Sequence, residues 1–402
     1  MNAGLIVIIL LLVLSILGIP IYLALGIGTL VALNMADMPF IVLPQKLFAG
    51  MNSSSLLAIP FFMLAGNIMS RSITGKLIDV SNALIGWIKG SLAVVTVLAS
   101  ALFGAISGSG VATASAVGGT TIPAMKEEGY PDHFAAAISG IAAILGPIIP
   151  PSITLIVYAS ITDLSVSKLF VGSVIPGILM AVGLIIYALF YGKKNDLPAH
   201  ERKSAKEVLL IFKDSIWALL MPVIILGGIF GGIFTPTESA AVAVVYALLV
   251  SLLIYKDIKI KDIPGIFVDG AISTATILML VGISKSSGYV ITTSGLPHQV
   301  LEVFSSFTNS TVVILLLLNI LFLVIGMLME ANAAIIMMSL NLCIGLVTPP
   351  VGICLLMTNQ IAEARFVQTL KSVMPMLLIG VVVLMLVTYI PQVTTFLPGL
   401  IK

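Results

Sequence analysis

Charged residues are spaced so unevenly along this chain that long uncharged stretches dominate its pattern. Runs without any charge cover residues 1–36, 91–125, 134–162, 303–329, 331–362 and 372–401. Each run exceeds the roughly 20 apolar residues with which a helix crosses a bilayer. The pattern predicts an all-α polytopic membrane protein. Because no basic residue precedes the first run, we expect a first transmembrane segment there and not a cleaved signal sequence.

Composition narrows the class of protein further. Only 9% of the 402 residues are charged and 59% are hydrophobic, whereas a soluble chain carries about 25% charged residues. A net charge of +2 offers no basic face for nucleic acid. The two cysteines, Cys343 and Cys354, lie in an apolar stretch, so neither a structural disulfide nor a cysteine zinc site is expected.

Two basic clusters predict the topology. The polar stretch 192–215 carries six lysine and arginine residues, and the positive-inside rule places it in the cytoplasm. Two apolar segments follow, 216–234 and 238–255, so the chain returns to the same side. There it meets the second cluster, which comprises Lys256, Lys259 and Lys261. The amphipathic stretch 79–89 is expected to lie along the membrane interface.

The turn between those two apolar segments reads Thr235-Pro-Thr-Glu238. Glu238 stands three residues after Thr235, which is the spacing of a capping box at a helix start. We therefore favour a structural role for Glu238 over a role in transport.

An internal repeat is the most informative feature of the chain. Gly146-Pro-Ile-Ile-Pro-Pro151 returns as Gly345-Leu-Val-Thr-Pro-Pro350, an offset of 199 residues. Proline forces each apolar helix to break and frees backbone carbonyls, and paired breaks indicate a transporter binding site. The expected organisation is a scaffold region (1–49), a first repeat (50–190), a basic loop with scaffold helices (191–264) and a second repeat (265–402), the two repeats being inverted.

The first repeat also contains a run of small residues, 101–119, without a charge. Its Ser-Gly-Ser-Gly110 segment suits the tip of a re-entrant helical hairpin. Gly104 and Gly108 also fit the small-x-x-x-small spacing of packed helices. We favour the hairpin because a matched helix break follows it.

The second repeat is shorter than the first. Gly104 to Gly146 spans 42 residues and Gly326 to Gly345 spans 19, a difference of 23 residues near positions 333–337. Either the second hairpin is truncated or this sequence lacks a stretch of it. The close match of the flanking segments favours the second explanation.

These motifs resemble the large membrane subunit of tripartite ATP-independent periplasmic (TRAP) transporters. The resemblance covers nearly the whole chain and rests on the 146–152 break and on Thr235-Pro-Thr-Glu238, Gly326-Met-Leu-Met-Glu330 and Asn341-Leu-Cys-Ile-Gly-Leu-Val-Thr-Pro-Pro-Val-Gly352. It implies sodium-driven uptake of a carboxylate, such as a C4-dicarboxylate or sialic acid, across the bacterial inner membrane by an elevator mechanism. It also implies a small four-helix membrane subunit, expected as a separate chain, and a soluble periplasmic binding protein.

Repeat position and this resemblance together predict two sodium sites. Backbone carbonyls and hydroxyls freed from helix ladders can hold this hard cation. The alternative is that these carbonyls bond to neighbouring helices or to water. The first set comprises Gly104, Ser107, Gly146, Ile149 and Pro151, and the second comprises Gly326, Gly345, Thr348 and Val351.

A substrate carboxylate needs hydrogen-bond donors and helix N-termini. Ser109 at the hairpin tip and Ser152 after the prolines fit this need. Glu330 occupies the place where the family usually has aspartate, and it either accepts substrate hydroxyls or shapes the hairpin. The three histidines, His133, His200 and His298, are scattered, so metal binding or acid–base work by them is not expected; Pro131 and His133 indicate a helix start.

Two other classes of protein fit the sequence less well. An intramembrane hydrolase would want a zinc-binding histidine pair, paired aspartates or a Gly-x-Ser-Gly nucleophile, and the sequence has no His-Glu-x-x-His. A channel would more naturally repeat one short pore motif by subunit symmetry. Sodium flux without substrate would separate a channel from a coupled carrier.

Overall fold

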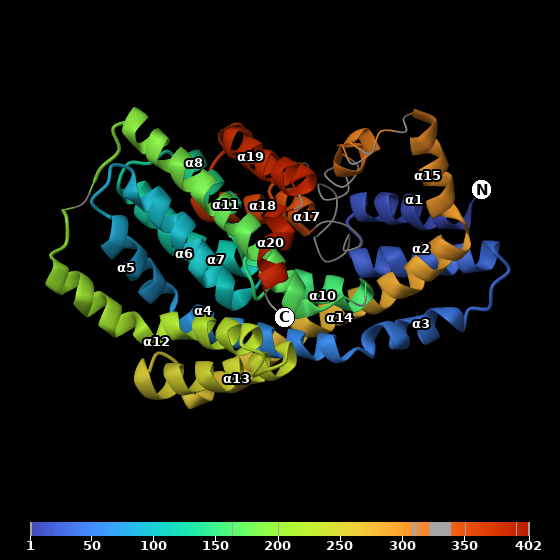
Figure 1. Cartoon of the computed structure of the whole chain (residues 1–402), viewed down its shortest axis with the longest axis horizontal. Helices are drawn as coiled ribbons and strands as arrows, with labels where there is room; N and C mark the ends of the chain where they lie inside the picture. The colour runs from blue at the N-terminus through green and yellow to red at the C-terminus, as the bar shows by residue number, and fades with distance from the viewer. Residues whose placement is uncertain are drawn as a thin grey trace.

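The computed structural model describes residues 2–162, 164–199, 201–307, 310, 312–314, 316–320, 339–349, 351–390 and 392–400. Helices make up all the regular structure in these residues (Figure 1). Five of the described helices are long and apolar enough to span a membrane, or up to seven spans if each of two bent pairs counts as one. The predicted all-α polytopic membrane fold with broken helices is confirmed.

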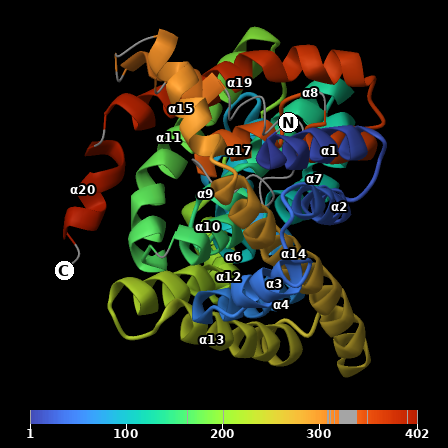
Figure 2. The ribbon, with the colours of Figure 1, turned by 90° about the vertical axis from the view of Figure 1, so that its right-hand side faces the viewer.

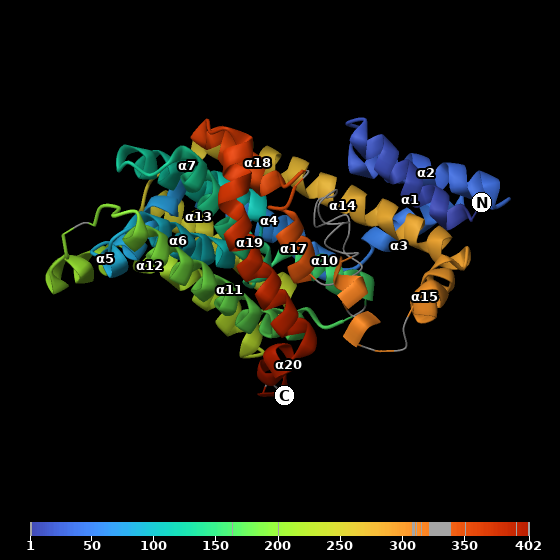
Figure 3. The same ribbon diagram turned by 90° about the horizontal axis from the view of Figure 1, so that it is seen from above.

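The N-terminal run folds differently from the single first segment that the sequence predicts. It forms two short helices, α1 (Ala3–Ile16) and α2 (Ile21–Met35), which pack on each other and on the long helix α14 (Ile263–Thr293) (Figure 3). Gly18, with φ of +83°, and Pro20 interrupt the helix between them. At 1.5 Å per residue each arm is only about 21–23 Å long, which is shorter than a bilayer core.

A broken span packs along α14 from the other side (Figure 2). It comprises α3 (Val42–Met51), a 3₁₀ turn (Ser54–Leu57) and α4 (Ala58–Ser72), with a bend of 62°. Ser286 Oγ in α14 donates a hydrogen bond to the Leu43 carbonyl at 2.9 Å. Arg71, at the end of α4, forms an exposed ion pair with Asp269 in the second turn of α14. These two elements therefore run antiparallel.

The predicted hairpin is present. After α5 (Thr74–Ile85), helix α6 (Ser91–Ser107) and helix α7 (Gly110–Glu127) pack against each other. Gly108 lies between them with φ of +62°, a conformation that favours glycine. The Ser109 side chain caps α7 by accepting a hydrogen bond from the Ala112 amide at 3.3 Å.

The first predicted helix break is also present. Helices α8 (Asp132–Ala143) and α9 (Leu145–Ile148) end at the prolines, and α10 (Ile153–Thr162) continues at a bend of 42°. Pro131 precedes α8 as predicted. Helix α11 (Val166–Lys194) then leads to the basic loop.

The second half shows the matching break. Its elements are α15 (Leu296–Phe307), α17 (Ser339–Gly345), α18 (Ile353–Ala362), α19 (Phe366–Tyr389) and α20 (Gln392–Leu400). Helices α18 and α19 pack on α8, so both broken helices share one hydrophobic core. The predicted 23-residue shortage near positions 333–337 lies outside the described residues.

Helices α12 (Ala205–Phe230) and α13 (Pro236–Leu249) form a hairpin along the lower edge of the view in Figure 1. The capping box at Thr235 and Glu238 is confirmed, because the Thr235 amide and hydroxyl both donate to Glu238 Oε2 at 2.8 Å. The Tyr255 hydroxyl, after α13, donates to the Asp214 carbonyl near the start of α12. The two basic clusters therefore lie at the same end, as predicted.

Candidate substrate and ion site

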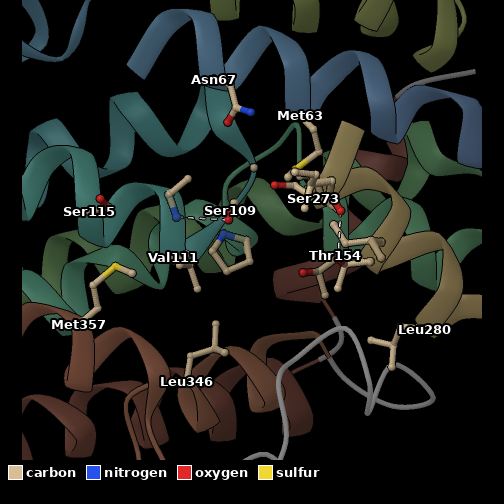
Figure 4. A pocket seen from close by; sticks show the side chains of 18 residues that line it. Met63, Asn67, Ser109, Val111, Ser115, Thr154, Ser273, Leu280, Leu346 and Met357 are labelled. Atoms are coloured by element: carbon tan, nitrogen blue, oxygen red, sulfur yellow. Dashed lines mark hydrogen bonds between the residues drawn. The ribbon is translucent and has the colours of Figure 1, made fainter. Parts of the chain in front are cut away.

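A cavity of about 470 Å³ lies where the α6–α7 tip, the first helix break and α14 meet (Figure 4). Its walls come from the hairpin and broken helices on one side and from α4 and α14 on the other. The residues that line it are Met63, Asn67, Gly108, Ser109, Gly110, Val111, Ala112, Ser115, Pro147, Ile153, Thr154, Ile272, Ser273, Thr276, Ile277, Leu280, Leu346 and Met357.

Two helix N-termini face this cavity from the hairpin side. Ser109, Gly110 and Val111 belong to the start of α7, and Ile153 and Thr154 belong to the start of α10. Unpaired amides and the helix dipole at such ends favour an anion. The polar groups of this wall are therefore suited to a carboxylate.

The hairpin tip and the helix break are held against each other. The Ile153 amide donates to the Gly108 carbonyl at 3.3 Å. A Cβ atom on Gly108 would come within 2.7 Å of the Pro151 carbonyl oxygen. Only glycine allows this approach, so the tip and the break form one wall.

The opposite wall carries polar side chains that the sequence analysis missed. Asn67 comes from α4, and Ser273 and Thr276 come from one face of α14 (Figure 4). The two α14 hydroxyls donate to carbonyls one turn earlier, Asp269 at 2.9 Å and Ile272 at 2.9 Å, and their oxygens can still accept. A polar pair three residues apart in a long apolar helix was the signal available in the sequence.

No lysine, arginine, aspartate or glutamate lines the cavity among the described residues. The walls of the cavity have a low dielectric constant. An anion between them would be held by hydroxyls, amides and helix ends, each of which carries a partial charge. An anion in such a site would avoid the full desolvation cost of a buried counter-charge.

Three members of the first predicted sodium set, Gly104, Ser107 and Gly146, come together below the tip. A Cβ on Gly104 would lie 2.7 Å from the Gly146 Cα. Ser107 Oγ lies 3.3 Å from the hydroxyl of Thr113, a neighbour that the sequence analysis did not select. The Gly104 carbonyl already accepts the Gly108 amide at 2.9 Å. The sodium role of this set stays a prediction.

The other two members are placed differently. The Pro151 carbonyl faces the hairpin tip at Gly108. The Ile149 side chain packs toward α11, where a Cβ on Gly177 would lie 2.7 Å from Ile149 Cγ1. Only backbone atoms of Ile149 are therefore available to an ion.

The second predicted set is only partly described, because Gly326 lies outside the described residues. The Gly345 carbonyl accepts the Thr348 amide at 3.1 Å, and the Thr348 hydroxyl donates to the Ile344 carbonyl at 2.7 Å. Val351 lines a separate cavity of about 370 Å³ beside Pro20 and Tyr22, at the turn between α1 and α2. Gly345 and Thr348 are thus close together, and Val351 faces the N-terminal helices.

The predicted substrate residues occupy different places in the structure. Ser109 lines the cavity. Ser152 is buried and is absent from the lining; its hydroxyl donates to the Pro147 carbonyl at 2.6 Å and accepts the Leu155 amide at 3.3 Å. Ser152 therefore stabilises the break instead of facing a substrate in this conformation. Glu330 and His200 lie outside the described residues, and His133 Nδ1 is 2.8 Å from Ser372 Oγ.

The broken helices, the hairpin tip and the uncharged cavity between them are those of a membrane transport protein. The family model of the tripartite ATP-independent periplasmic transporter DctM component matches residues 8–340 and 333–393. The chain belongs to this family. The two matched segments meet at residues 333–340, close to the predicted 23-residue shortage.

Two transport proteins agree with this family assignment, and a solved structure shares the fold. The C4-dicarboxylate TRAP transporter large permease protein DctM of Pseudomonas aeruginosa is 38% identical over 88% of each chain. The sialic acid TRAP transporter large permease protein SiaM of Vibrio cholerae is 33% identical over 89% of each chain. The crystal structure of the Alcanivorax borkumensis YdaH transporter shares the fold, with a TM-score of 0.56 and 13% identity over 87% of each chain.

Proposed function

We propose that this chain carries a small carboxylate, of the C4-dicarboxylate or sialic acid class, across the bacterial inner membrane by coupling its uptake to sodium entry. The observation that carries the proposal is the uncharged cavity onto which two helix N-termini and the hydroxyls of Ser109, Thr154, Ser273 and Thr276 converge. The names of the Pseudomonas aeruginosa and Vibrio cholerae relatives support the two substrate classes.

Sodium would bind at the helix breaks beside this cavity. The first site would use Gly104, Ser107 and Gly146, with the backbone of Ile149 and Pro151. The second would use Gly345 and Thr348, with Gly326 and Val351. Two ions that each cross 100 mV contribute about 2.3 kcal/mol apiece, which is enough to concentrate a singly charged anion against its own electrical cost.

The movement would be that of an elevator. The hairpin α6–α7 and the broken helices would slide as one unit against α3, α4 and α14, and would carry the substrate from one membrane face to the other. One wall of the cavity comes from the hairpin and the broken helices and the other from α4 and α14. This supports the division into a moving unit and a scaffold. A separate small four-helix subunit would enlarge the scaffold, and a periplasmic binding protein would deliver the substrate.

The scaffold wall provides a direct test with a matched control. Thr276→Val removes a hydroxyl that lines the cavity, whereas Thr293→Val removes one from the same helix outside it. Both hydroxyls donate to a carbonyl four residues earlier, at 2.9 and 2.8 Å. The Thr276 hydroxyl can rotate away from the Ile272 carbonyl and donate to a substrate carboxylate instead. Because a hydrogen bond to a charged group contributes about 1.5–3 kcal/mol, Thr276→Val should raise the substrate concentration for half-maximal uptake roughly tenfold.

The measurement is initial uptake of labelled succinate and sialic acid into proteoliposomes that also contain the partner proteins. Thr293→Val should behave like the unaltered protein. Unchanged half-saturation in Thr276→Val, with normal expression, would show that the substrate does not contact this wall.

A further inference from the structure

A second cavity, of about 660 Å³, lies between α5 and the start of α12, far from the transport cavity. Leu84 and Trp87 form one side, at and just after the end of α5. Arg202 and Lys203 form the other, just before α12, and Leu209 and Phe212 continue it along that helix. One end of the cavity is therefore basic and the rest is apolar.

The basic end of the cavity has no ion-pair partner in the described part of the chain. Among the described residues, neither Arg202 nor Lys203 forms an ion pair with a carboxylate. The Arg202 guanidinium instead lies 5.2 Å from the centre of the Trp87 ring. This cation–π contact holds Arg202 at the cavity without neutralising it.

The nearby charged groups are largely committed elsewhere. Lys89 pairs with Asp196, and the ammonium holds the pKa of that carboxyl below its usual range. The Glu207 carboxylate accepts the Ser204 amide and hydroxyl at 2.7 and 2.8 Å in the capping box of α12. Glu201 is exposed in the loop. Glu207 also interacts with the Lys203 charge and so weakens the attraction of Lys203 for an anion. An anion at the cavity would therefore meet Arg202 first, with Lys203 beside it.

The apolar side of the cavity is open. Leu84 is 48% exposed and Leu209 is 71% exposed. Leu209 lies in the first turns of a candidate membrane span that begins at Ala205. Tryptophan and basic side chains mark the membrane–water boundary, and the basic loop is expected on the cytoplasmic face. A ligand that satisfies both ends must be amphipathic, with an anionic head and hydrocarbon chains.

We propose that this cavity binds one anionic phospholipid of the cytoplasmic leaflet. Its phosphate lies between Arg202 and Lys203, and its acyl chains lie along Leu84, Leu209 and Phe212. Anionic lipids are attracted to basic segments beside membrane spans, and the apolar wall supplies the part of the site that a soluble phosphate would leave empty.

The experiment is native mass spectrometry of the purified full chain with added phosphatidylglycerol or phosphatidylcholine. The unaltered protein should retain phosphatidylglycerol in preference. R202Q/K203Q should weaken this retention about thirtyfold. The matched control is K193Q/K194Q, which removes the same charge from the end of α11, outside the cavity, and should retain the lipid like the unaltered protein.

Two further measurements test the shape of the site. Leu84→Ser with Leu209→Ser should reduce retention although both basic residues remain. Millimolar glycerol 3-phosphate should not displace the lipid. Equal loss in both charge variants, no preference for phosphatidylglycerol, or displacement by glycerol 3-phosphate would each overturn the proposal. Thermal unfolding of each variant checks that it is folded, and none of these readouts depends on transport.

Discussion

Replacing Gly146 with alanine is expected to reduce uptake by about tenfold or more and to destabilise the protein. A Cβ atom there would lie 2.7 Å from both the Ser109 carbonyl oxygen and Thr113 Oγ1. The backbone of the hairpin tip would have to move, and overpacking of this kind typically costs about 1–3 kcal/mol. The displacement would reach both the N-terminus of α7 and the first predicted sodium set. Initial uptake rate and thermal unfolding would measure the two effects.

Gly119→Ala is the matched control, because this glycine lies in the same hairpin and no atom beyond its own turns of helix lies within 4 Å of its added Cβ. Alanine in place of glycine within a helix favours the helix, so stability should stay equal or rise slightly and uptake should be unchanged. Normal transport by Gly146→Ala would show that close contact between tip and break is unnecessary.

Linking the two walls of the cavity should stop transport almost completely. Ser109→Cys lies on the hairpin side and Ser273→Cys on the scaffold side. A short reducible bis-thiol reagent would join them in a background in which the buried Cys343 and Cys354 are replaced by alanine. If one wall slides against the other, the link should block uptake and dithiothreitol should restore it.

The control for this experiment is a link within the scaffold. Arg71→Cys with Asp269→Cys joins α4 to α14 at an ion pair outside the cavity, so uptake should continue. Full transport with a quantitative link between Ser109→Cys and Ser273→Cys would contradict an elevator movement at this interface.

Much of the fold could be predicted from the sequence because its causes are local. Uncharged runs longer than a bilayer crossing identify helices. The two adjacent prolines at 150 and 151 end a helix, whereas single prolines such as Pro176 and Pro222 lie inside helices. The capping box at Thr235 and Glu238 involves two residues in one turn. The glycine at 108 is needed because a left-handed backbone joins α6 to α7.

The rest depends on packing between distant segments. Ser152 and Ser109 both follow helix breaks, and only the structure shows that one hydroxyl bonds across the break and the other faces the cavity. Ser273 and Thr276 look like other small polar residues of a membrane helix until α14 is placed opposite the hairpin. An uncharged run indicates that a segment prefers the membrane, but it does not indicate how many helices the segment forms. The N-terminal run, which forms two short helices, shows this.

The most direct test of the central claim is sodium dependence of uptake. Proteoliposomes that contain the chain and its partner proteins would receive labelled succinate or sialic acid under an inward sodium gradient, with potassium or choline replacing sodium in parallel. The proposed coupling predicts that uptake of either substrate collapses without sodium. Two sodium ions with the singly charged sialic acid carry one net positive charge, so its uptake should rise when the interior is made negative, whereas two sodium ions with the succinate dianion carry none. Undiminished uptake in sodium-free buffer would contradict the proposed coupling.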